Sequence, residues 1–370
     1  MPAWSPRVLV LPASLLARQR TIGGGERYAL EFARALSEQV PTTLGLFDLD
    51  ERHEQDGKLE VRTFGVRHYS FRWGFPATLA TWQALAEYDV VHLMCFPTTL
   101  SDALVPLARL RKQVVVLTDV GGGGRCWSGY LKKLHPRCDL HRFAHGLAHL
   151  SGHASTFFRD WSRPGTVLFG GARPELYPAG GPQGYVLFVG RLLPHKGVLQ
   201  AIQAVTPGMP LRVVGRPYDA EYFQHLQAAA AGKDVVFITD ASDAELAQHY
   251  AGANVILQVS LPNPTPGGDK SELLGLVALE GMAAGKPVIV TRTTSLPELV
   301  VDGVTGFIVP PYDLVALRDK MGLLLRDVNL SRRMGEQARE HVQAHFTWSA
   351  VARRGLDFYR ALATRHGYIR

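Results

Sequence analysis

Short apolar runs alternate with amphipathic helical patterns along most of the chain. The runs that we expect to form strands lie at 7–11, 43–47, 90–94, 114–118, 147–150 and 166–169, and then at 185–189, 211–214, 235–238, 255–259, 287–290 and 306–309. Strands that alternate with helices are typical of parallel sheets covered on both faces. The pattern therefore predicts an α/β protein with doubly wound sheets.

A segment rich in glycine and proline, residues 178–184, interrupts this alternation near the middle of the chain. Such a composition is typical of linkers. We therefore predict one domain at residues 1–177 and a second at 178–349, followed by a helical pattern at about 350–370. In open parallel sheets, ligands bind beyond the carboxyl ends of the strands, so we expect functional residues in the loops that follow strands.

The composition supports two ordinary globular domains. The length of 370 residues is large for one core, and 46% hydrophobic with 20% charged residues is average. The 3 cysteines give no disulfide framework, and the first residues lack a signal peptide's features. No apolar run approaches the roughly 20 residues of a membrane span. We therefore expect a cytoplasmic protein, whose net charge of +7 could favour peripheral contact with an anionic membrane.

Glu272 and Glu280 stand eight residues apart around the start of a predicted helix. The helical pattern begins after Gly275, so Glu272 precedes the helix and Glu280 lies on it, roughly 12 Å away at the rise of an α-helix. The free amides and positive end of the helix form an anion site between the two carboxylates. A nucleotide sugar has the same layout, because its sugar and its ribose flank a pyrophosphate.

A cationic loop follows the first strand of the second half. It contains Arg191 and Lys196 between Gly190 and Gly197. Arginine can hold phosphate oxygens bidentately and lysine supplies a mobile point charge, so both are candidates for phosphate binding. The alternative is a pair of solvated loop cations.

Two loops in the first half carry further candidates. Residues 23–25 are glycines between the first strand and a helix expected at 26–39, and they allow close approach of a phosphate or sugar. Tyr28 stands where the dinucleotide-binding fingerprint needs its third glycine. Asp119 follows another strand and could orient a sugar or an acceptor hydroxyl, or simply initiate a turn.

Six residues with metal-binding side chains lie close together in the sequence: His135, Cys138, His141, His145, His149 and His153. The last four would share one face of a helix. A strand-like run at 147–150 divides them, however, so we expect them on a helix, a strand and a second helix rather than at a zinc site. The segment 127–145 mixes basic and aromatic residues; it could contact lipid, but we favour an amphipathic helix packed on the sheet.

The acidic pair belongs to a longer string that resembles the signature of retaining glycosyltransferases of family four, the glycogen-synthase-like group with the GT-B fold. The string runs Gly-Leu-Val-Ala-Leu-Glu-Gly-Met-Ala-Ala-Gly-Lys-Pro-Val-Ile over residues 275–289, and continues as Leu-Pro-Glu-Leu-Val at 296–300 and Asp-Gly-Val-Thr-Gly-Phe-Ile-Val-Pro-Pro at 302–311. Gly-Arg-Leu at 190–192 and Lys-Gly at 196–197 also match. The resemblance is strong at 185–311 and weak at 42–155.

The resemblance implies two Rossmann-like domains that face a cleft, with the C-terminal helix crossing back to the first. It also implies that Glu272 contacts the donor sugar, that Glu280 accepts the ribose hydroxyls, and that the amides of Gly275 and Leu276 bind the pyrophosphate. The candidate donor-binding residues are Gly24, Gly25, Gly190, Arg191, Lys196, Glu272, Leu274, Gly275, Leu276 and Glu280. The candidates for catalysis are Arg191, Lys196, Glu272 and Asp119, although many relatives carry a histidine near the position of Asp119.

The implied activity is transfer of a hexosyl group from a nucleoside-diphosphate sugar to a hydroxyl acceptor, with retention of configuration and without a metal or other cofactor. A nucleotide-sugar epimerase or hydrolase with the same fold is the alternative. We expect a monomer or weak dimer that has no nucleic-acid partner. The segment 261–270 departs from the family pattern and suggests an ordered excursion beside the donor sugar. The base, the sugar and the acceptor therefore stay open.

Overall fold

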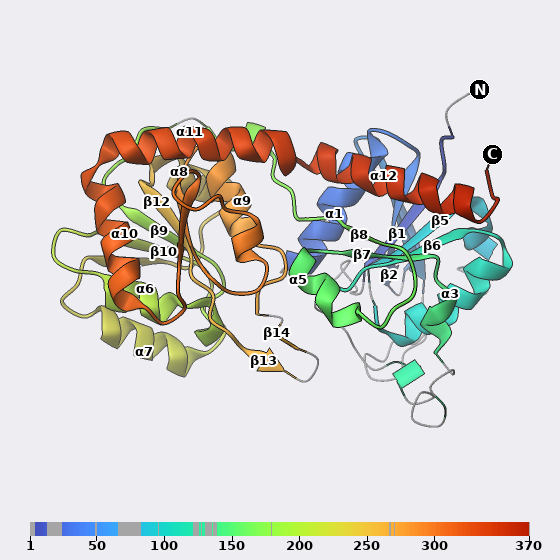
Figure 1. Cartoon of the computed structure of the whole chain (residues 1–370), viewed down its shortest axis with the longest axis horizontal. Helices are drawn as coiled ribbons and strands as arrows, with labels where there is room; N and C mark the ends of the chain where they lie inside the picture. The colour runs from blue at the N-terminus through green and yellow to red at the C-terminus, as the bar shows by residue number, and fades with distance from the viewer. Residues whose placement is uncertain are drawn as a thin grey trace. The chain divides into compact units, whose positions relative to one another are not determined.

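The computed structural model describes residues 4–12, 24–48, 50–65, 83–94, 96–120, 126, 128–129, 135, 139–178, 180–265, 268–269 and 271–369. The chain divides into two compact units, which Figure 1 colours along the sequence. Unit 1 comprises Met1–Leu150, Phe158–Phe169 and Trp348–Arg370, and unit 2 comprises Ser151–Phe157 and Gly170–Thr347. The sequence placed residues 151–157 and 170–177 in the first domain, whereas they pack with unit 2.

The described part of unit 1 is built on an eight-stranded sheet with the order β3-β4-β2-β1-β5-β6-β7-β8. Its neighbouring strands pair in parallel, except that β3 is antiparallel to β4. The strands are β1 (Val8–Pro12), β2 (Thr42–Asp48), β3 (Arg52–Asp56), β4 (Leu59–Gly65), β5 (Val90–Met94), β6 (Val114–Leu117), β7 (Gly146–His149) and β8 (Gly165–Val167). The main helices are α1 (Gly24–Ser37), α3 (Thr99–Leu110) and α12 (Trp348–Arg365).

Unit 2 contains a six-stranded parallel sheet, within its described residues, with the order β11-β10-β9-β12-β15-β16. The strands are β9 (Val186–Val189), β10 (Leu211–Val214), β11 (Val235–Ile238), β12 (Val255–Gln258), β15 (Val288–Thr291) and β16 (Gly306–Val309). The helices are α5 (Gly152–Ser155), α6 (Val198–Ala204), α7 (Ala220–Ala230), α8 (Asp243–Gly252), α9 (Leu276–Ala283), α10 (Leu314–Arg326) and α11 (Val328–His345). The strand order reverses between β9 and β12, which makes that point the expected ligand-binding position.

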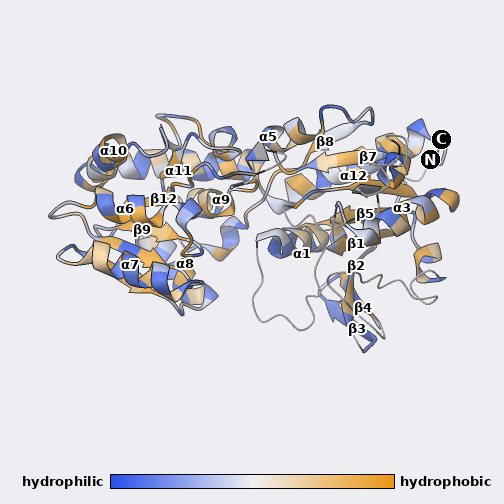
Figure 2. Cartoon of the chain, turned by 90° about the horizontal axis from the view of Figure 1, so that it is seen from below, coloured by the Kyte–Doolittle hydropathy of each residue, from blue (hydrophilic) through white to orange (hydrophobic). Residues whose placement is uncertain are grey.

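The apolar runs identified in the sequence form the strands at the centre of each sheet. Figure 2 shows these strands mainly in the hydrophobic colour, because parallel strands covered on both faces are buried throughout. The exception is β3, whose side chains are all polar and exposed. This edge strand and its partner β4 were missed in the sequence, since β3 has no apolar positions to reveal it.

Helix α12 packs within unit 1, as the sequence predicted for the C-terminal helix. Its buried Tyr359 contacts His92 of β5, with 2.6 Å between the hydroxyl oxygen and Nδ1. Trp348, at the start of the helix, lies edge-on against Tyr28 of α1. No described helix combines the length and the apolar character that crossing a bilayer would require.

Candidate functional site

The reversal of strand order in unit 2 brings together two loops that the sequence singled out. The loop after β9 contains Gly190, Arg191 and Lys196, and the connection after β12 leads to Glu272. Because β9 and β12 are parallel neighbours, both loops leave the same edge of the sheet. The cationic and acidic candidates therefore meet at one site.

The loop after β9 is held in place by Gly197, which follows Lys196. Gly197 has a φ of +75°, and a Cβ atom at this position would lie 1.9 Å from the carbonyl oxygen of Val259. Only glycine fits a left-handed conformation with the backbone of the next strand so close. This close approach directs the Lys196 side chain toward the connection after β12.

Lys196 and Glu272 form an ion pair. The distance from Nζ to Oε2 is 2.8 Å, and the two side chains are 17% and 12% exposed. The same Glu272 oxygen accepts a hydrogen bond from Ser260, and Oε1 accepts one from the backbone amide of Gly275. Two residues after β15, Thr294 and Ser295, donate to the Glu272 carbonyl oxygen. Glu272 is thus fixed at both its carboxylate and its backbone.

These contacts decide the charge of Glu272. Burial alone would raise the pKa of the Glu272 carboxyl, but Lys196, Gln258 and the Gly275 amide outweigh burial and lower that pKa. The carboxylate is therefore ionised at neutral pH and can accept hydrogen bonds.

A glycine in the left-handed conformation precedes helix α9 and follows Glu272 by three positions. Gly275 is the N-cap with a φ of +62°, and a Cβ there would lie 2.3 Å from a methyl carbon of Leu299. The residue before it, Leu274, is 7% exposed and packs inward. Among the described residues, the amides of Leu276 and Val277 make no recorded hydrogen bond, so they form the open part of the helix end.

Glu280 lies on α9 and is 7% exposed. Its Oε2 accepts a hydrogen bond of 2.9 Å from the hydroxyl of buried Tyr250 on α8. Tyr250 in turn packs edge-on against Tyr177. The carboxylate is therefore oriented by an aromatic pair, and its expected contact with a ribose stays a prediction.

Arg191 lies on the exposed side of the same loop, with its guanidinium over the ring of Tyr218 at 5.7 Å. His195 lies in the same loop and was not selected in the sequence analysis. The charges of both Arg191 and Glu272 act on its side chain. Burial lowers the pKa of His195, as do Lys196 and Arg191, while Glu272 and Asp269 raise it. His195 is therefore surrounded by the site's charges, and its place directly before Lys196 was the only signal in the sequence.

The described residues of the segment 261–270 include a short hairpin. Strands β13 (Pro264–Thr265) and β14 (Gly268–Asp269) pair antiparallel. Oδ1 of Asp269 accepts the amides of Asn263 and Ser271, and its carbonyl oxygen lies 2.9 Å from Nε2 of His153. The hairpin is therefore anchored next to the residue that precedes Glu272.

The remaining candidates belong to unit 1. Gly24 and Gly25 begin α1 after β1, and a Cβ on Gly25 would lie 3.3 Å from Val120. Asp119, directly before Val120, is 7% exposed and follows β6. The glycine loop and Asp119 are therefore neighbours at the carboxyl edge of this sheet, although Gly23 and residues 121–125 lie outside the described residues.

His149 ends β7 at the same edge. The sequence analysis weighed this residue as a metal ligand and did not favour that role. Burial lowers the pKa of His149, and the charge of Asp119 opposes that shift. The described histidines of the cluster lie on different elements, as expected: His141 on a 3₁₀ turn, His149 on β7 and His153 on α5. No group of three or more metal-binding side chains is found among the described residues, which exclude Cys138.

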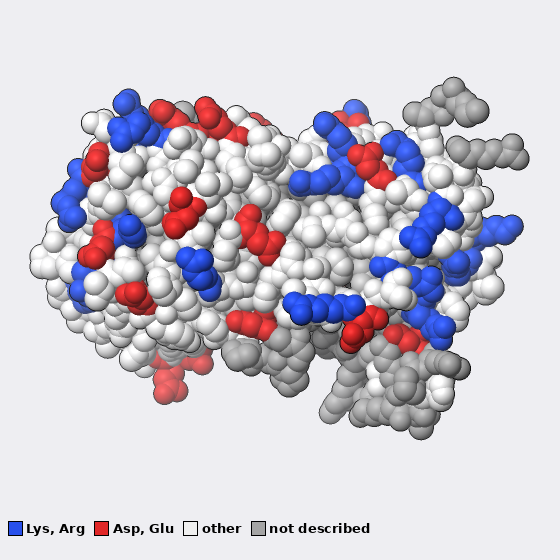
Figure 3. All heavy atoms as spheres, in the orientation of Figure 1, with Lys and Arg blue, Asp and Glu red and all other residues white. Residues whose placement is uncertain are grey.

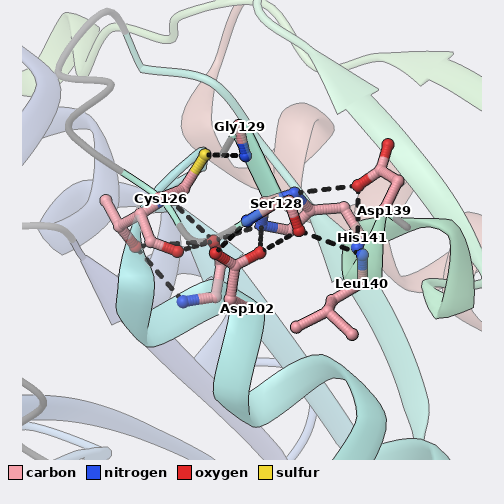
Figure 4. A network of polar contacts seen from close by, with 9 residues as sticks. Asp102, Cys126, Ser128, Gly129, Asp139, Leu140 and His141 are labelled. Atoms are coloured by element: carbon pink, nitrogen blue, oxygen red, sulfur yellow. Dashed lines mark hydrogen bonds and ion pairs between the residues drawn. The ribbon is translucent and has the colours of Figure 1, made fainter. Parts of the chain in front are cut away.

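A buried polar network ties the start of the segment 127–145 to α3. Asp102, which is fully buried, accepts hydrogen bonds from the amide and hydroxyl of Ser128, and its Oδ1 lies 3.1 Å from Nε2 of His141 (Figure 4). Asp139 caps the turn that carries His141. The described part of this segment is therefore packed on the protein, whereas most of its basic and aromatic residues lie outside the described residues.

Part of the sequence is similar to known glycosyltransferases. Residues 177–341 match the family described as "Glycosyl transferases group 1". The chain is 33% identical over 180 residues to a D-inositol 3-phosphate glycosyltransferase of Corynebacterium glutamicum, covering 45% of this chain and 41% of that protein. It is also 33% identical to a GDP-mannose-dependent phosphatidylinositol monomannoside mannosyltransferase of Mycolicibacterium smegmatis, covering 45% of each. The matched region thus spans less than half the length of these relatives.

Two solved structures resemble nearly the whole chain. Sucrose-phosphate synthase of Thermosynechococcus elongatus has a TM-score of 0.71 at 22% identity, covering 97% of this chain and 99% of that one. HepE of Anabaena, solved with UDP and glucose, has a TM-score of 0.72 at 19% identity, covering 96% of this chain and 100% of that one. This likeness concerns the fold, and it confirms the GT-B fold predicted from the sequence.

Proposed function

We propose that this GT-B protein, which is similar to the glycosyltransferases of family four, moves a hexosyl group from a nucleoside-diphosphate sugar to a hydroxyl acceptor with retention of configuration. The observation that carries the proposal is the Lys196–Glu272 ion pair of 2.8 Å beside the open amides of α9. This site brings together a cation that can bind phosphate, an ionised carboxylate that can accept hydrogen bonds from hydroxyls, and a helix end that can bind a diphosphate.

The proposed chemistry is stabilisation of a leaving group. When the bond between the sugar and the phosphate oxygen breaks, the departing nucleoside diphosphate gains negative charge. Lys196, Arg191 and the amides of Leu276 and Val277 would stabilise that charge, and Glu272 would hold the sugar hydroxyls. The acceptor oxygen then bonds to the anomeric carbon, and its proton passes to the departing phosphate.

Several relatives support a nucleotide-sugar donor. HepE has been solved with UDP and with UDP-glucose, and the mycobacterial relative depends on GDP-mannose. They differ in base, so we propose the donor class without choosing uridine or guanosine. We also propose that the reaction needs no metal, which unchanged turnover after EDTA treatment would support.

A cationic cluster on unit 1 supports an anionic acceptor or a peripheral contact with an anionic membrane. Arg109 and Arg163 lower the pKa of both His145 and His366, in addition to the effect of burial, and Arg365 also acts on His366. Figure 3 shows lysine and arginine gathered on this unit's visible face. Flotation with phosphatidylglycerol vesicles, compared with phosphatidylcholine vesicles, tests the membrane contact.

The activity is tested by a thermal-shift panel of UDP, GDP and ADP, followed by mass spectrometry of products with the matching sugars. We expect Glu280→Ala to weaken nucleotide binding and Arg191→Ala mainly to lower turnover, with Glu280→Gln as the control for folding. If both alanine variants match the parent protein, the assigned roles are wrong.

The alternative activity is epimerisation or hydrolysis of the nucleotide sugar on the same fold. It would need an acid-base pair near the anomeric carbon. Incubation with donor alone separates the two activities: a new epimer, or hydrolysis as fast as transfer, would favour the alternative.

A further inference from the structure

The segment 261–270 is hydrogen-bonded to the cationic loop of unit 2 at both of its ends. At the first end, the amide of Leu261 donates to the carbonyl oxygen of His195 at 2.7 Å. At the second end, Nζ of Lys196 donates to the carbonyl oxygen of Ser271 at 3.3 Å. The conformation of this segment therefore affects the loop that carries the candidate phosphate-binding residues.

Asp269 closes the segment across its base. One oxygen of its carboxylate, Oδ1, accepts the amide of Asn263 at 3.2 Å and the amide of Ser271 at 2.9 Å. Hydrogen bonds from amides to a carboxylate are stronger than those between neutral groups. Because Ser271 directly precedes Glu272, Asp269 fixes the path by which the chain enters the acidic residue.

His153 holds the backbone of Asp269 from outside the segment. Both residues belong to unit 2, and Nε2 of His153 lies 2.9 Å from the carbonyl oxygen of Asp269. A carbonyl oxygen can only accept a hydrogen bond, so Nε2 carries the proton and donates it. The ring of His153 also lies edge-on against Phe157, with 5.1 Å between the ring centroids, which limits the orientation of the imidazole.

The short helix α5, which carries His153, is itself fixed within unit 2. The amides of Gly152 and His153 donate to the two carboxylate oxygens of Glu298, each at 2.7 Å. Three residues before Glu298, the hydroxyl of Ser295 donates to the carbonyl oxygen of Glu272 at 3.0 Å. One stretch after β15 therefore holds both the acidic residue and the helix of His153.

We propose that His153 and Asp269 are positioning residues for the donor sugar, because they fix the segment 261–270 and, through Ser271, the place of Glu272. The inference rests on the proposed function for its ligand, the hexosyl part of a nucleotide sugar, whereas the hydrogen bonds belong to the protein alone. These bonds do not involve helix α9, so binding of the diphosphate part should depend on them less. Sugar binding would thus depend on a segment that departs from the family pattern.

Three substitutions separate these contacts. His153→Leu removes the donor to the Asp269 carbonyl, and His153→Gln retains an N–H donor at the end of a side chain of similar length. Asp269→Ala removes the acceptor of two amides but keeps the carbonyl oxygen that His153 binds. As the control, His225→Leu makes the first change at an exposed residue of α7. Each variant is assayed for binding of UDP, GDP, UDP-glucose and GDP-mannose, and for kcat and KM with the nucleotide sugar that the parent uses.

For His153→Leu we expect kcat/KM for the nucleotide sugar to fall by about 3- to 10-fold, which corresponds to one neutral hydrogen bond, while nucleoside-diphosphate affinity stays within about twofold of the parent. Asp269→Ala should cost about 10- to 100-fold, because two bonds to a charged group are lost. His153→Gln should recover most of the parental kcat/KM, and His225→Leu should match the parent. A role in folding alone would lower the melting temperature and weaken nucleotide and nucleotide sugar equally, which would overturn the inference.

Hydrogen exchange at the amides of Asn263 and Ser271 gives a readout that does not depend on activity. We expect both amides to exchange faster in Asp269→Ala, and to a smaller extent in His153→Leu, because local opening becomes easier. Parental exchange rates in both variants would overturn the inference, whatever the assays show. If exchange increases but the parent protein binds none of the four nucleotides, the bracing of the segment stands and the proposed function fails.

Discussion

The two units share one strand order but use the ends of their strands differently. Without its edge strand β3, the sheet of unit 1 follows the same order as that of unit 2, extended by one strand. At the carboxyl edge of unit 2, Lys196 and Glu272 are charged and in contact. In the interior of unit 1, by contrast, His92 in the middle of β5 is buried between the hydroxyls of Thr118 and Tyr359.

The pKa values show the same contrast. In unit 2 the contacts of Glu272 lower its pKa and favour the charged form. In unit 1 burial lowers the pKa of His92 to about 3, and burial together with Arg109 lowers that of His145 to about 3, which favours the neutral form. The contacts of Glu272 in unit 2 thus favour a charged side chain, whereas the surroundings of these two histidines in unit 1 favour neutral ones.

A shared strand order does not by itself determine which side chains stand at the ends of the strands. The sheet order fixes where a ligand can bind, but the residues after each strand fix what can bind there. The family match covers residues 177–341, which all belong to unit 2. We therefore associate the charged edge of unit 2, which lies in the matched region, with the proposed donor, and expect unit 1 to contribute to acceptor binding.

The largest effect is expected for Lys196→Met. The substitution leaves the buried Glu272 carboxylate without its cation. It also removes the positive charge that would stabilise the proposed anionic leaving group, so turnover should fall by about 100- to 1,000-fold. Steady-state kinetics with the nucleotide sugar measure the loss. Lys58→Met, at a side chain that is 66% exposed in unit 1, should retain parental turnover; equal losses in both variants would remove the distinction between the units.

Acidification should destabilise unit 1 before unit 2. His92 and His145 are neutral when folded, so below pH 6.5 the unfolded chain binds protons that the folded one does not, and each costs about 2 kcal/mol of unfolding free energy at pH 5. In unit 2, burial also lowers the pKa of three histidines, His195, His249 and His341, but these side chains are only partly buried, so we expect a smaller loss from each. The pKa of Glu272 is lowered from 4.5, so its stabilising contribution is lost only as the pH falls below that range.

Hydrogen exchange of each unit at pH 5 and pH 7, corrected for intrinsic rates, tests this order. His92→Gln retains a hydrogen-bonding side chain that does not titrate, and should reduce the acid sensitivity of unit 1. Earlier opening of unit 2 would contradict the contrast drawn here.

Gly275→Ala should destabilise unit 2 by about 1–3 kcal/mol, because the residue is left-handed and the added methyl group meets Leu299. Urea unfolding measures the change. Gly208→Ala introduces the same backbone strain at a φ of +78° with nothing within 4 Å, so the difference between the two variants isolates the clash. Equal destabilisation would show that packing at the start of α9 is loose.

The smallest effect on donor binding is expected for Asp119→Asn. Asp119 belongs to unit 1, whereas Lys196 and Glu272 of the proposed donor site belong to unit 2, so we expect nucleoside-diphosphate affinity to change by about twofold or less. Kinetics with varied acceptor should show the larger change, in KM for the acceptor. A strong loss of nucleotide affinity would instead place Asp119 in the donor site.

The sequence by itself determined the sheet strands with apolar runs, such as 90–94 and 211–214, which the structure reproduces residue for residue. The capping box of Ser242 and Glu245 at the start of α8 is likewise formed by residues close together in the sequence. Both signals are local, because a strand's burial and a helix's cap are written in neighbouring residues. The string around Glu280 likewise carried the family likeness without any structure.

Only the tertiary structure decided which residues meet. Lys196 and Glu272 lie 76 positions apart, and Gln258 at the end of β12 accepts the amide of Ala278 on helix α9. The exposed strand β3 and the influence of the Asp119 charge on the pKa of His149 also could not be predicted from neighbouring residues in the sequence. The physical reason is that hydrogen bonds and ion pairs across a sheet edge depend on which strands become neighbours, and that is set by the packing of the whole unit rather than by any short stretch of sequence.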